Sequence, residues 1–316
     1  MVSLSMLAHK GIMDLHTHGI GNYDTRTKNP EDILKIASLH GRAGTSAILP
    51  TVYSGAVRQM RENMEAVRRA MQAQGVKGSR GQGVKRGEKK ILNLTQPSTF
   101  NLQPSSLILG VHLEGPFLNP TKCGALNKGS FIKPSISSLK KLIDGYEDII
   151  KIITIAPELP GALKVIKKCA SMGIRVNMGH SDATYKQALD GKKAGARSIS
   201  HIFNAMRQFH HREPGLAGFG LLDEEIYIEV IADGIHLSPD VLRFIFKIKP
   251  HDRILLVSDS IKGAKDKKGA IYTKNGVLAG SSISLADAVR NLKNLGIPEA
   301  EALKSAVKTP KKYLTA

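Results

Sequence analysis

The sequence predicts an α/β protein of 316 residues that folds as one TIM barrel, in which eight parallel strands are surrounded by helices. Three observations support this prediction. Short runs of Ile, Leu and Val alternate with segments of helical periodicity along almost the whole chain. Most of these runs have neighbouring apolar residues rather than a strict alternation of apolar and polar ones, as in parallel strands that are buried on both faces. Metal-ligand residue types close several of the runs, and the carboxyl ends of the strands carry the active site in a TIM barrel.

Eight runs are expected to form the barrel strands. In chain order they are residues 12–16, 46–50, 107–113, 150–155, 174–179, 197–201, 226–231 and 254–258. The helices expected around them are residues 31–42, 56–74, 137–144, 161–172, 183–194, 239–248, 285–295 and 299–307. Pro30 precedes the first of these helices, and Gly173 and Gly195 follow two later ones, as is typical of helix starts and ends.

We expect the barrel to cover residues 11–316, after an N-terminal extension of residues 1–10. The connection 75–106 is longer than most loops in compact domains, and residues 75–90 within it are rich in Gly, Lys and Arg. This basic loop contributes to a net charge of +19 but has no aromatic residues on which bases could stack. We therefore expect a surface loop, no nucleic-acid partner, and a positive field that steers an anionic small substrate.

Cysteine content and hydropathy indicate the compartment. Cys123 and Cys169 are too few for a disulfide framework, and their separation is not a zinc-binding spacing. No window approaches the roughly 18 consecutive apolar residues of a membrane span, and the N-terminus lacks the charged start of a signal peptide. These features predict a soluble cytoplasmic protein without a membrane partner.

Six residues with metal-binding or acid/base side chains close separate strand-like runs. Imidazoles and carboxylates together suit zinc or another borderline divalent ion. Any one of these histidines could be a core residue, but six at strand ends predict a metal-dependent hydrolase. Asp259 follows a very apolar run and is the candidate general base, which takes a proton from the attacking water and returns it to the leaving group. The six residues are His16, His18, Glu114, His180, His201 and Asp259.

Three further segments are candidates for substrate binding. Arg212, in the loop after the sixth strand, could clamp a phosphate or could be an ordinary surface residue. The segment from Asp233 to His236 ends the seventh strand, so His236 should face the same pocket. Residues 276–282 offer backbone amides and hydroxyls close after Asp259, or form a simple hairpin turn.

The chain resembles the N-acetylglucosamine-6-phosphate deacetylases of the amidohydrolase superfamily. The matching motifs run in order from residue 11 to about residue 295, so the resemblance covers nearly the whole chain. The EGPF and NAM…REPG pieces are specific to this family rather than to the superfamily. The motifs are MDLHTHG (13–19), GTSAILPT (44–51), HLEGPFLNP (112–120), IAPE (155–158), GHSDA (179–183), HIFNAM (201–206), HREPG (211–215), DGIH (233–236), VSD (257–259) and LAGS (278–281).

The resemblance implies hydrolysis of the N-acetyl group of N-acetylglucosamine 6-phosphate, which yields glucosamine 6-phosphate and acetate. It implies that Glu114, His180 and His201 hold the principal divalent metal ion, zinc or iron(II), and that His16 and His18 can hold a second. It also implies that Asp259 is the acid/base, and that Arg212 reaches the neighbouring subunit's pocket in a homodimer. The substrate-binding residues implied are Ala125, Asn204, Ala205, Arg212, Asp233, His236, Leu278, Ala279 and Gly280.

Two departures from the family pattern leave alternatives open. Family members usually build a small β-sandwich from segments before and after the barrel, and we expect this domain to be missing here. The family usually has His or Gln after Ala125, where it can polarise the substrate carbonyl, but this chain has Leu126. A second metal ion could take over that role. The alternatives are an amidohydrolase that acts on a related acetamido sugar or a cyclic amide, and a weak or inactive barrel with a binding role.

Overall fold

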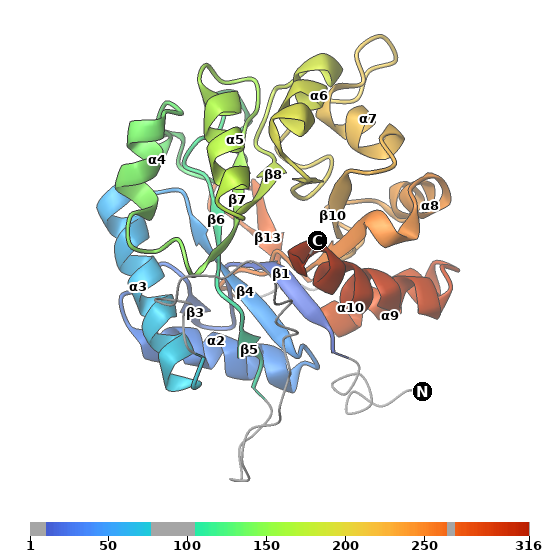
Figure 1. The fold of residues 1–316 in the computed structure, drawn as a ribbon. Coiled ribbons are helices and arrows are strands. Elements are labelled where there is room, and N and C mark those ends of the chain that lie inside the picture. Colours follow the sequence, from blue (N-terminus) through green and yellow to red (C-terminus); the bar gives the residue numbers. More distant parts are fainter. Residues whose placement is uncertain (1–10, 77–104, 264–268, 316) are drawn as a thin grey trace, which may run out of the picture.

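A computed structural model describes residues 11–76, 105–263 and 269–315. Their main sheet runs in the order β1-β4-β6-β7-β8-β9-β10-β11, and every pair of neighbours in this order is parallel. The last strand returns to the first, because Asp259 N–H donates to the His16 carbonyl at 2.9 Å. The TIM barrel prediction is therefore confirmed (Figure 1). The strands are β1 (Met13–Thr17), β4 (Ala47–Tyr53), β6 (Val111–Glu114), β7 (Ile150–Ile155), β8 (Arg175–Met178), β9 (Ser198–Ile199), β10 (Tyr227–Ile231) and β11 (Ile254–Val257).

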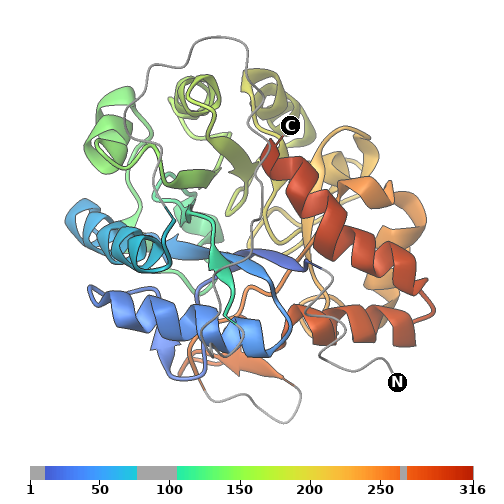
Figure 2. The same cartoon turned by 60° about the horizontal axis from the view of Figure 1, so that its bottom comes forward.

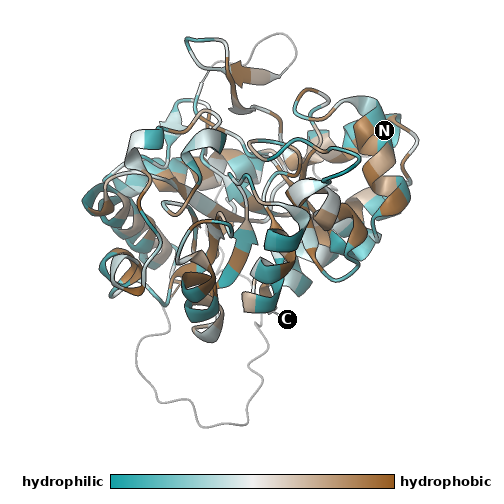
Figure 3. Ribbon diagram, turned by 90° about the horizontal axis from the view of Figure 1, so that it is seen from above, coloured by the Kyte–Doolittle hydropathy of each residue, from teal (hydrophilic) through white to brown (hydrophobic). Residues whose placement is uncertain are grey.

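Helices surround this barrel, as Figure 2 shows from a second direction. Several begin with a side-chain cap, such as Thr184 and Ser284, each of which forms a reciprocal capping box with the residue three positions later. Figure 3 shows hydrophilic and hydrophobic residues side by side on these helices, as amphipathic packing onto a sheet requires. The helices are α2 (Pro30–Arg42), α3 (Val57–Ala73), α4 (Ile136–Ile143), α5 (Ala162–Ser171), α6 (Tyr185–Ala194), α7 (Gly215–Leu222), α8 (Pro239–Ile248), α9 (Leu285–Asn294) and α10 (Glu299–Thr315).

The remaining elements are short. Strands β2 (Gly19–Ile20) and β3 (Tyr23–Asp24) form one hairpin, and β12 (Ala270–Tyr272) and β13 (Leu278–Ser281) form another. Strand β5 (Leu107–Ile108) pairs with β4 just before β6. Three single-turn 3₁₀ helices are η1 (Pro120–Lys122), η2 (Lys128–Ser130) and η3 (His251–Arg253).

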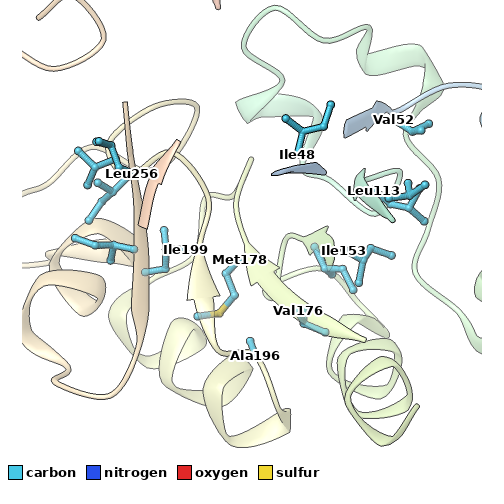
Figure 4. Close-up of a cluster of buried hydrophobic side chains, with 14 of the residues drawn as sticks. Ile48, Val52, Leu113, Ile153, Val176, Met178, Ala196, Ile199 and Leu256 are labelled. Carbon is cyan, nitrogen blue, oxygen red and sulfur yellow. The ribbon is translucent and has the colours of Figure 1, made fainter. Parts of the chain in front are cut away.

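The apolar core has two parts. The larger lies between the strands and the surrounding helices, and Figure 4 shows side chains such as Val176, Met178 and Ala196 in this layer. The smaller lies inside the barrel, where Tyr313 from α10 packs against Tyr227 with ring centroids 4.9 Å apart. The C-terminal helix thus places an aromatic ring among the inward-facing side chains of the strands. The other members of this inner cluster are Leu15, Leu49, Ile152 and Leu255.

Three element predictions were wrong. Helix α7 was not expected, because its sequence is apolar on all sides and contains three glycines. Helix α10 was expected to end at residue 307, before Pro310, but it continues to Thr315 with Thr309 and Pro310 buried. The strand expected over residues 107–113 is divided at Gly110, whose φ of +148° and contact with the Ile149 carbonyl leave no room for a Cβ.

Two expectations fall on residues outside the described ranges. These are the extension 1–10 and nearly all of the basic loop 75–90. Among the helices of the described ranges, none has both the length and the apolar character needed to cross a membrane.

Candidate active site

The carboxylate of Glu114 lies at the centre of the predicted metal ligands. Its Oε1 is 3.1 Å from Nε2 of His180 and 3.2 Å from Nε2 of His201. Its Oε2 is 3.2 Å from Nε2 of His18. His16 Nε2 lies 3.5 Å from Oε1. The structure therefore brings the predicted ligands together from four different strand ends, with one glutamate between two pairs of imidazoles.

Asp259 completes this cluster on the cavity side. Its Oδ1 is 3.6 Å from Nε2 of His16 and 3.5 Å from Nε2 of His18. Its side chain is 13% exposed, whereas that of Glu114 is 4% exposed. Asp259 is thus the carboxylate of the pair with access to a molecule in the cavity.

The orientation of the four imidazoles is set by the hydrogen bond that each Nδ1 makes. In every case this nitrogen lies within hydrogen-bond distance of an acceptor, so it carries the proton in the neutral ring. The unprotonated Nε2 then points to the centre of the cluster, as in histidines that bind metal ions. The acceptors are Glu229 Oε2 for His16 (2.9 Å), the Thr51 carbonyl for His18 (3.0 Å), the Lys122 carbonyl for His180 (2.9 Å) and the Asn204 carbonyl for His201 (3.3 Å).

These distances fit divalent metal ions. Nε2 of His16 and Nε2 of His18 are 3.3 Å apart. Two nitrogens at about 2.0–2.1 Å from a tetrahedral zinc ion would be roughly 3.3 Å apart. Two facing lone pairs repel each other unless a cation or a proton lies between them. The donor atoms within each of two sets lie within 4.8 Å of one another: His16–His18–Glu114 and Glu114–His180–His201.

The histidines of the cluster stabilise the ionised forms of its two carboxylates. Burial would raise the pKa of Asp259, but His16, His18 and His201 lower it below its ordinary value, so the carboxylate is ionised at neutral pH. The pKa of Glu114 is likewise lowered well below its usual range, against burial, chiefly by His18 and His180. Two anionic carboxylates in a water-poor site are what a divalent cation needs as partners.

The backbone is strained at this cluster. His180, His201 and Asp259 have φ angles of 47°, 27° and 46°, in the left-handed region that favours glycine. Phe203 and Ala205 share this feature, and no other non-glycine residue of the described ranges does. Each such residue costs of order 1–3 kcal/mol and persists where the surroundings fix it, typically at functional sites.

A cavity of about 430 Å³ opens onto the cluster. Leu126 is part of its wall, so the position at which a donor was expected does face the site. Several of the predicted substrate-binding residues also line it, namely Ala125, Asn204, Ala205, His236, Leu278 and Ala279.

Three predicted substrate-binding residues do not line this cavity. Asp233 lies behind His236, with Oδ2 2.6 Å from His236 Nδ1, and therefore orients that ring. Gly280 is behind the wall, where an added Cβ would come within 2.8 Å of the Asp259 carbonyl. Arg212 lies in an exposed loop, with Nη1 2.9 Å from His211 Nε2.

The sequence reasoning missed residues on both sides of the cluster. Tyr53 stacks on His18 at a centroid distance of 3.7 Å, and the Arg26 guanidinium lies 3.8 Å above the Tyr53 ring. Arg26 and Lys262 bring positive charge to the cavity wall. Beneath the cluster, Glu229 is fully buried on β10. An ionisable residue in an otherwise apolar strand was the signal for Glu229, whereas nothing in the sequence singles out Arg26 or Tyr53.

Several curated proteins are similar to this chain, although no protein-family model matches it. N-Acetylgalactosamine-6-phosphate deacetylase from Escherichia coli O157:H7 is 30% identical over 317 residues, which cover 96% of this chain and 76% of that protein. N-Acetylglucosamine-6-phosphate deacetylase from Lysinibacillus sphaericus is 29% identical, with 90% of this chain and 70% of that protein covered. The Vibrio furnissii protein of the same name is also 29% identical, with 96% and 73% covered.

Solved structures agree with these similarities. N-Acetylglucosamine-6-phosphate deacetylase from Thermotoga maritima has a TM-score of 0.80 and 27% identity, over 96% of this chain and 78% of that one. The Mycobacterium smegmatis protein in complex with N-acetyl-D-glucosamine-6-phosphate has a TM-score of 0.81 and 25% identity, over 96% and 77% of the two chains. An amidohydrolase from Pseudomonas aeruginosa, at 11% identity and a TM-score of 0.51, shares the fold.

Proposed function

This chain belongs to the N-acetylglucosamine-6-phosphate deacetylase family of the amidohydrolase superfamily, and we propose that it hydrolyses the N-acetyl group of N-acetylglucosamine 6-phosphate. The products are glucosamine 6-phosphate and acetate. One observation carries the proposal: four imidazoles, each held by an acceptor on Nδ1, direct their Nε2 atoms at the Glu114 carboxylate, beside the partly exposed Asp259. An inactive barrel has no need of this arrangement.

We assign the principal divalent ion, zinc or iron(II), to Glu114, His180 and His201, and a second ion to His16 and His18. Each set contains the nitrogen and oxygen donors that these ions accept. When bound, the metal supplies Lewis acidity, which lowers the pKa of water that it holds to about 7 and polarises a carbonyl. Glu114 faces both sets, since Oε1 lies next to His180 and His201 and Oε2 lies next to His18, and so it could contribute an oxygen to either.

Asp259 is the proposed acid/base. Its carboxylate is ionised and faces the cavity, so it can accept the proton of the attacking water. The same proton can then pass to the sugar nitrogen as the C–N bond breaks, so that the nitrogen leaves as a neutral amine and not as an amide anion. The hydrogen bond from Asp259 N–H to the His16 carbonyl fixes the residue on the strand end.

Polarisation of the acetyl carbonyl is the step for which this chain lacks the family's side chain. Leu126 lines the cavity but has no donor, and its backbone N–H is already bonded to the Cys123 carbonyl at 3.0 Å. In our proposal His16 and His18 would hold an ion whose Lewis acidity would supply this polarisation. Both imidazoles are therefore required for activity.

The phosphate end of the substrate needs donors and positive charge. We propose that Asn204, Ala205 and His236 contact it, since all three line the cavity. Arg212 is outside the cavity of its own chain, so its contribution would come from a neighbouring subunit in a homodimer. Alanine replacement of Arg212 and of the cavity-lining Arg26 separates the two sources of charge. A rise in KM for Arg212→Ala in the dimer, with a smaller change for Arg26→Ala, is the expected result.

The test of the function is acetate release by the purified protein with zinc, iron(II) or chelator. Metal-dependent turnover of N-acetylglucosamine 6-phosphate is expected, together with a dimeric mass in solution. Folded, metal-loaded protein without turnover would refute the assignment.

A second substrate has specific support. The E. coli relative at 30% identity is named for N-acetylgalactosamine 6-phosphate, which differs from the glucosamine sugar only in the configuration at C4. The two sugars should be compared under the same conditions by kcat/KM. A higher value for the galactosamine sugar would change the substrate but leave the reaction and the residue roles in place.

A further inference from the structure

A buried carboxylate that the proposed reaction does not use lies next to His16. Glu229 is on β10, in the interior of the barrel, and its side chain is 0% exposed. Its Oε2 is 2.9 Å from Nδ1 of His16. A carboxylate removed from water is costly unless charged or hydrogen-bonding groups surround it, so a glutamate in this place calls for a reason.

Hydrogen bonds around Glu229 can run in only one direction. A carboxylate accepts but does not donate, so three groups must donate to it: His16 Nδ1–H at 2.9 Å, the Asn177 side-chain amide at 2.7 Å and the His201 backbone N–H at 3.3 Å. The amide oxygen of Asn177 is thereby turned away, and it accepts from the Tyr313 hydroxyl at 2.6 Å. A chain of three hydrogen bonds thus joins the C-terminal helix to His16. Because His16 must carry its proton on Nδ1, its Nε2 is left free to bind a metal ion.

His16 differs in this respect from the other three imidazoles of the cluster. Backbone carbonyls hold His18, His180 and His201, and no side-chain substitution removes those acceptors. For His16 the orienting acceptor is a side chain. Carboxylates that orient a ligating histidine also raise its basicity, and their loss typically weakens metal binding by about 10–100-fold.

We propose that Glu229 is a positioning residue for metal binding at His16 and His18. Glu229 Oε2 also accepts the His201 backbone N–H at 3.3 Å, but the His201 ring is oriented by the Asn204 carbonyl, so the position formed by Glu114, His180 and His201 depends on Glu229 less than the position at His16 does. This proposal rests on the proposed function for the presence of an ion at His16 and His18. The proposal goes beyond that function because it makes occupancy of the position at His16 and His18 depend on a side chain that is not among the ligands assigned to either ion.

Two variants of similar size separate orientation from packing. Glu229→Gln keeps an oxygen acceptor for His16, since Asn177 can rotate its amide to match, whereas Glu229→Met fills the same space without an acceptor. Tyr313→Phe is the control, because it removes the far end of the hydrogen-bond chain and leaves His16 and Glu229 in place. All variants are compared with the full-length wild type by circular dichroism and thermal melting.

The readout is metal binding itself. Apoprotein is titrated with zinc or cobalt(II) in a calorimeter, and bound metal is counted by elemental analysis after gel filtration. We expect two ions in the wild type, about 10-fold weaker binding of one of them in Glu229→Gln, and loss of that ion in Glu229→Met. The other ion should be weakened clearly less than this one, because the His201 ring keeps its own acceptor, and Tyr313→Phe should retain both.

Several outcomes would overturn the proposal. Wild-type affinity for both ions in Glu229→Gln would do so even where Glu229→Met does not fold. Equal weakening of both ions, or the same loss in Tyr313→Phe, would show that Glu229 serves the barrel core rather than His16. A wild type that binds one ion refutes the positioning role but leaves the proposed deacetylation standing. A wild type that binds two ions without turnover would refute the proposed deacetylation but leave the positioning role of Glu229 standing.

Discussion

Replacement of Asp259 by Asn gives the sharpest test of the proposed chemistry. Three carboxylates line the cavity within the described residues. Glu114 is committed to imidazoles on both of its oxygens, and Asp24 accepts the Arg26 backbone N–H at 2.7 Å. Asp259 alone combines an ionised state, access to the cavity and a place beside the ligand imidazoles. The proton transfer that deacetylation requires is therefore assigned to this one side chain.

The expected magnitude follows from that assignment. A positioned general acid/base typically contributes 10²–10⁴-fold in rate, which corresponds to about 3–5 kcal/mol of barrier. Asp259→Asn keeps the size of the side chain but cannot take up the proton, so kcat should fall by this factor while KM changes little. Burial and the fixed backbone should keep the fold intact.

The assay is acetate release under saturating metal, with bound metal measured in the same samples. Asp240→Asn is a suitable control, since the Asp240 side chain is 92% exposed on α8. A metal-loaded Asp259→Asn protein that retained more than a tenth of wild-type kcat would refute the reasoning. A variant that lost its metal would instead show Asp259 to be chiefly a ligand, because its Oδ1 is only 3.5–3.6 Å from two ligand nitrogens.

Three further predictions concern other parts of the chain. Leu126→Gln should restore a hydrogen-bond donor to the substrate carbonyl. In protein loaded with one ion it should raise kcat by up to about 10²-fold, and in protein loaded with two ions kcat should hardly change. An equal gain in both states would contradict the role given to the second ion. Burial lowers the pKa of His40 to about 4. Between pH 4 and 6.5 the unfolded state therefore binds a proton at His40 that the folded state does not bind. Stability should therefore be lost as pH falls from 6.5 towards 4, by about 2 kcal/mol at pH 5, and urea melts of His40→Gln should lack this component. Burial raises the pKa of the Cys169 thiol to about 12, whereas Cys123 is only half-buried. A thiol reagent at pH 8 should therefore label Cys123 in the folded protein and reach Cys169 only after unfolding. Rapid labelling of both cysteines in folded protein would contradict the structure.

The barrel strands could be predicted from the sequence because parallel strands in this fold are buried on both faces. Residues 150–155, for example, contain four isoleucines, and the structure has β7 over the same bounds. Strand order and the position of the cluster at the carboxyl ends then followed from the chirality and connectivity of β/α units. The candidate metal ligands could be selected from the sequence because each lies at or just after the end of such a run.

The failures have a different physical origin. Helix α10 continues past Pro310 because its last turn places Tyr313 among inward-facing residues of the barrel, and local sequence does not report that tertiary contact. Arg26 reaches the cavity from the turn after β3, through stacking on Tyr53. Both depend on where distant segments meet, so neither periodicity nor motif spacing could indicate them.

Glu229 shows how one class of missed residue could be found. In an open sheet with one exposed face, a polar residue within an apolar strand is read as solvent-facing. Helices cover the outer face of a barrel strand, so the side chain of an ionisable residue at such a position has to enter the barrel interior or be buried against a helix. Glu229 lies between Ile228 and Val230, which both belong to the outer apolar core, and alternation along the strand therefore turns Glu229 inward. An inward carboxylate two positions before the end of a strand lies just below the ligands at the carboxyl end. Its expected partner is a ligating imidazole, which is the role that the Glu229 variants test.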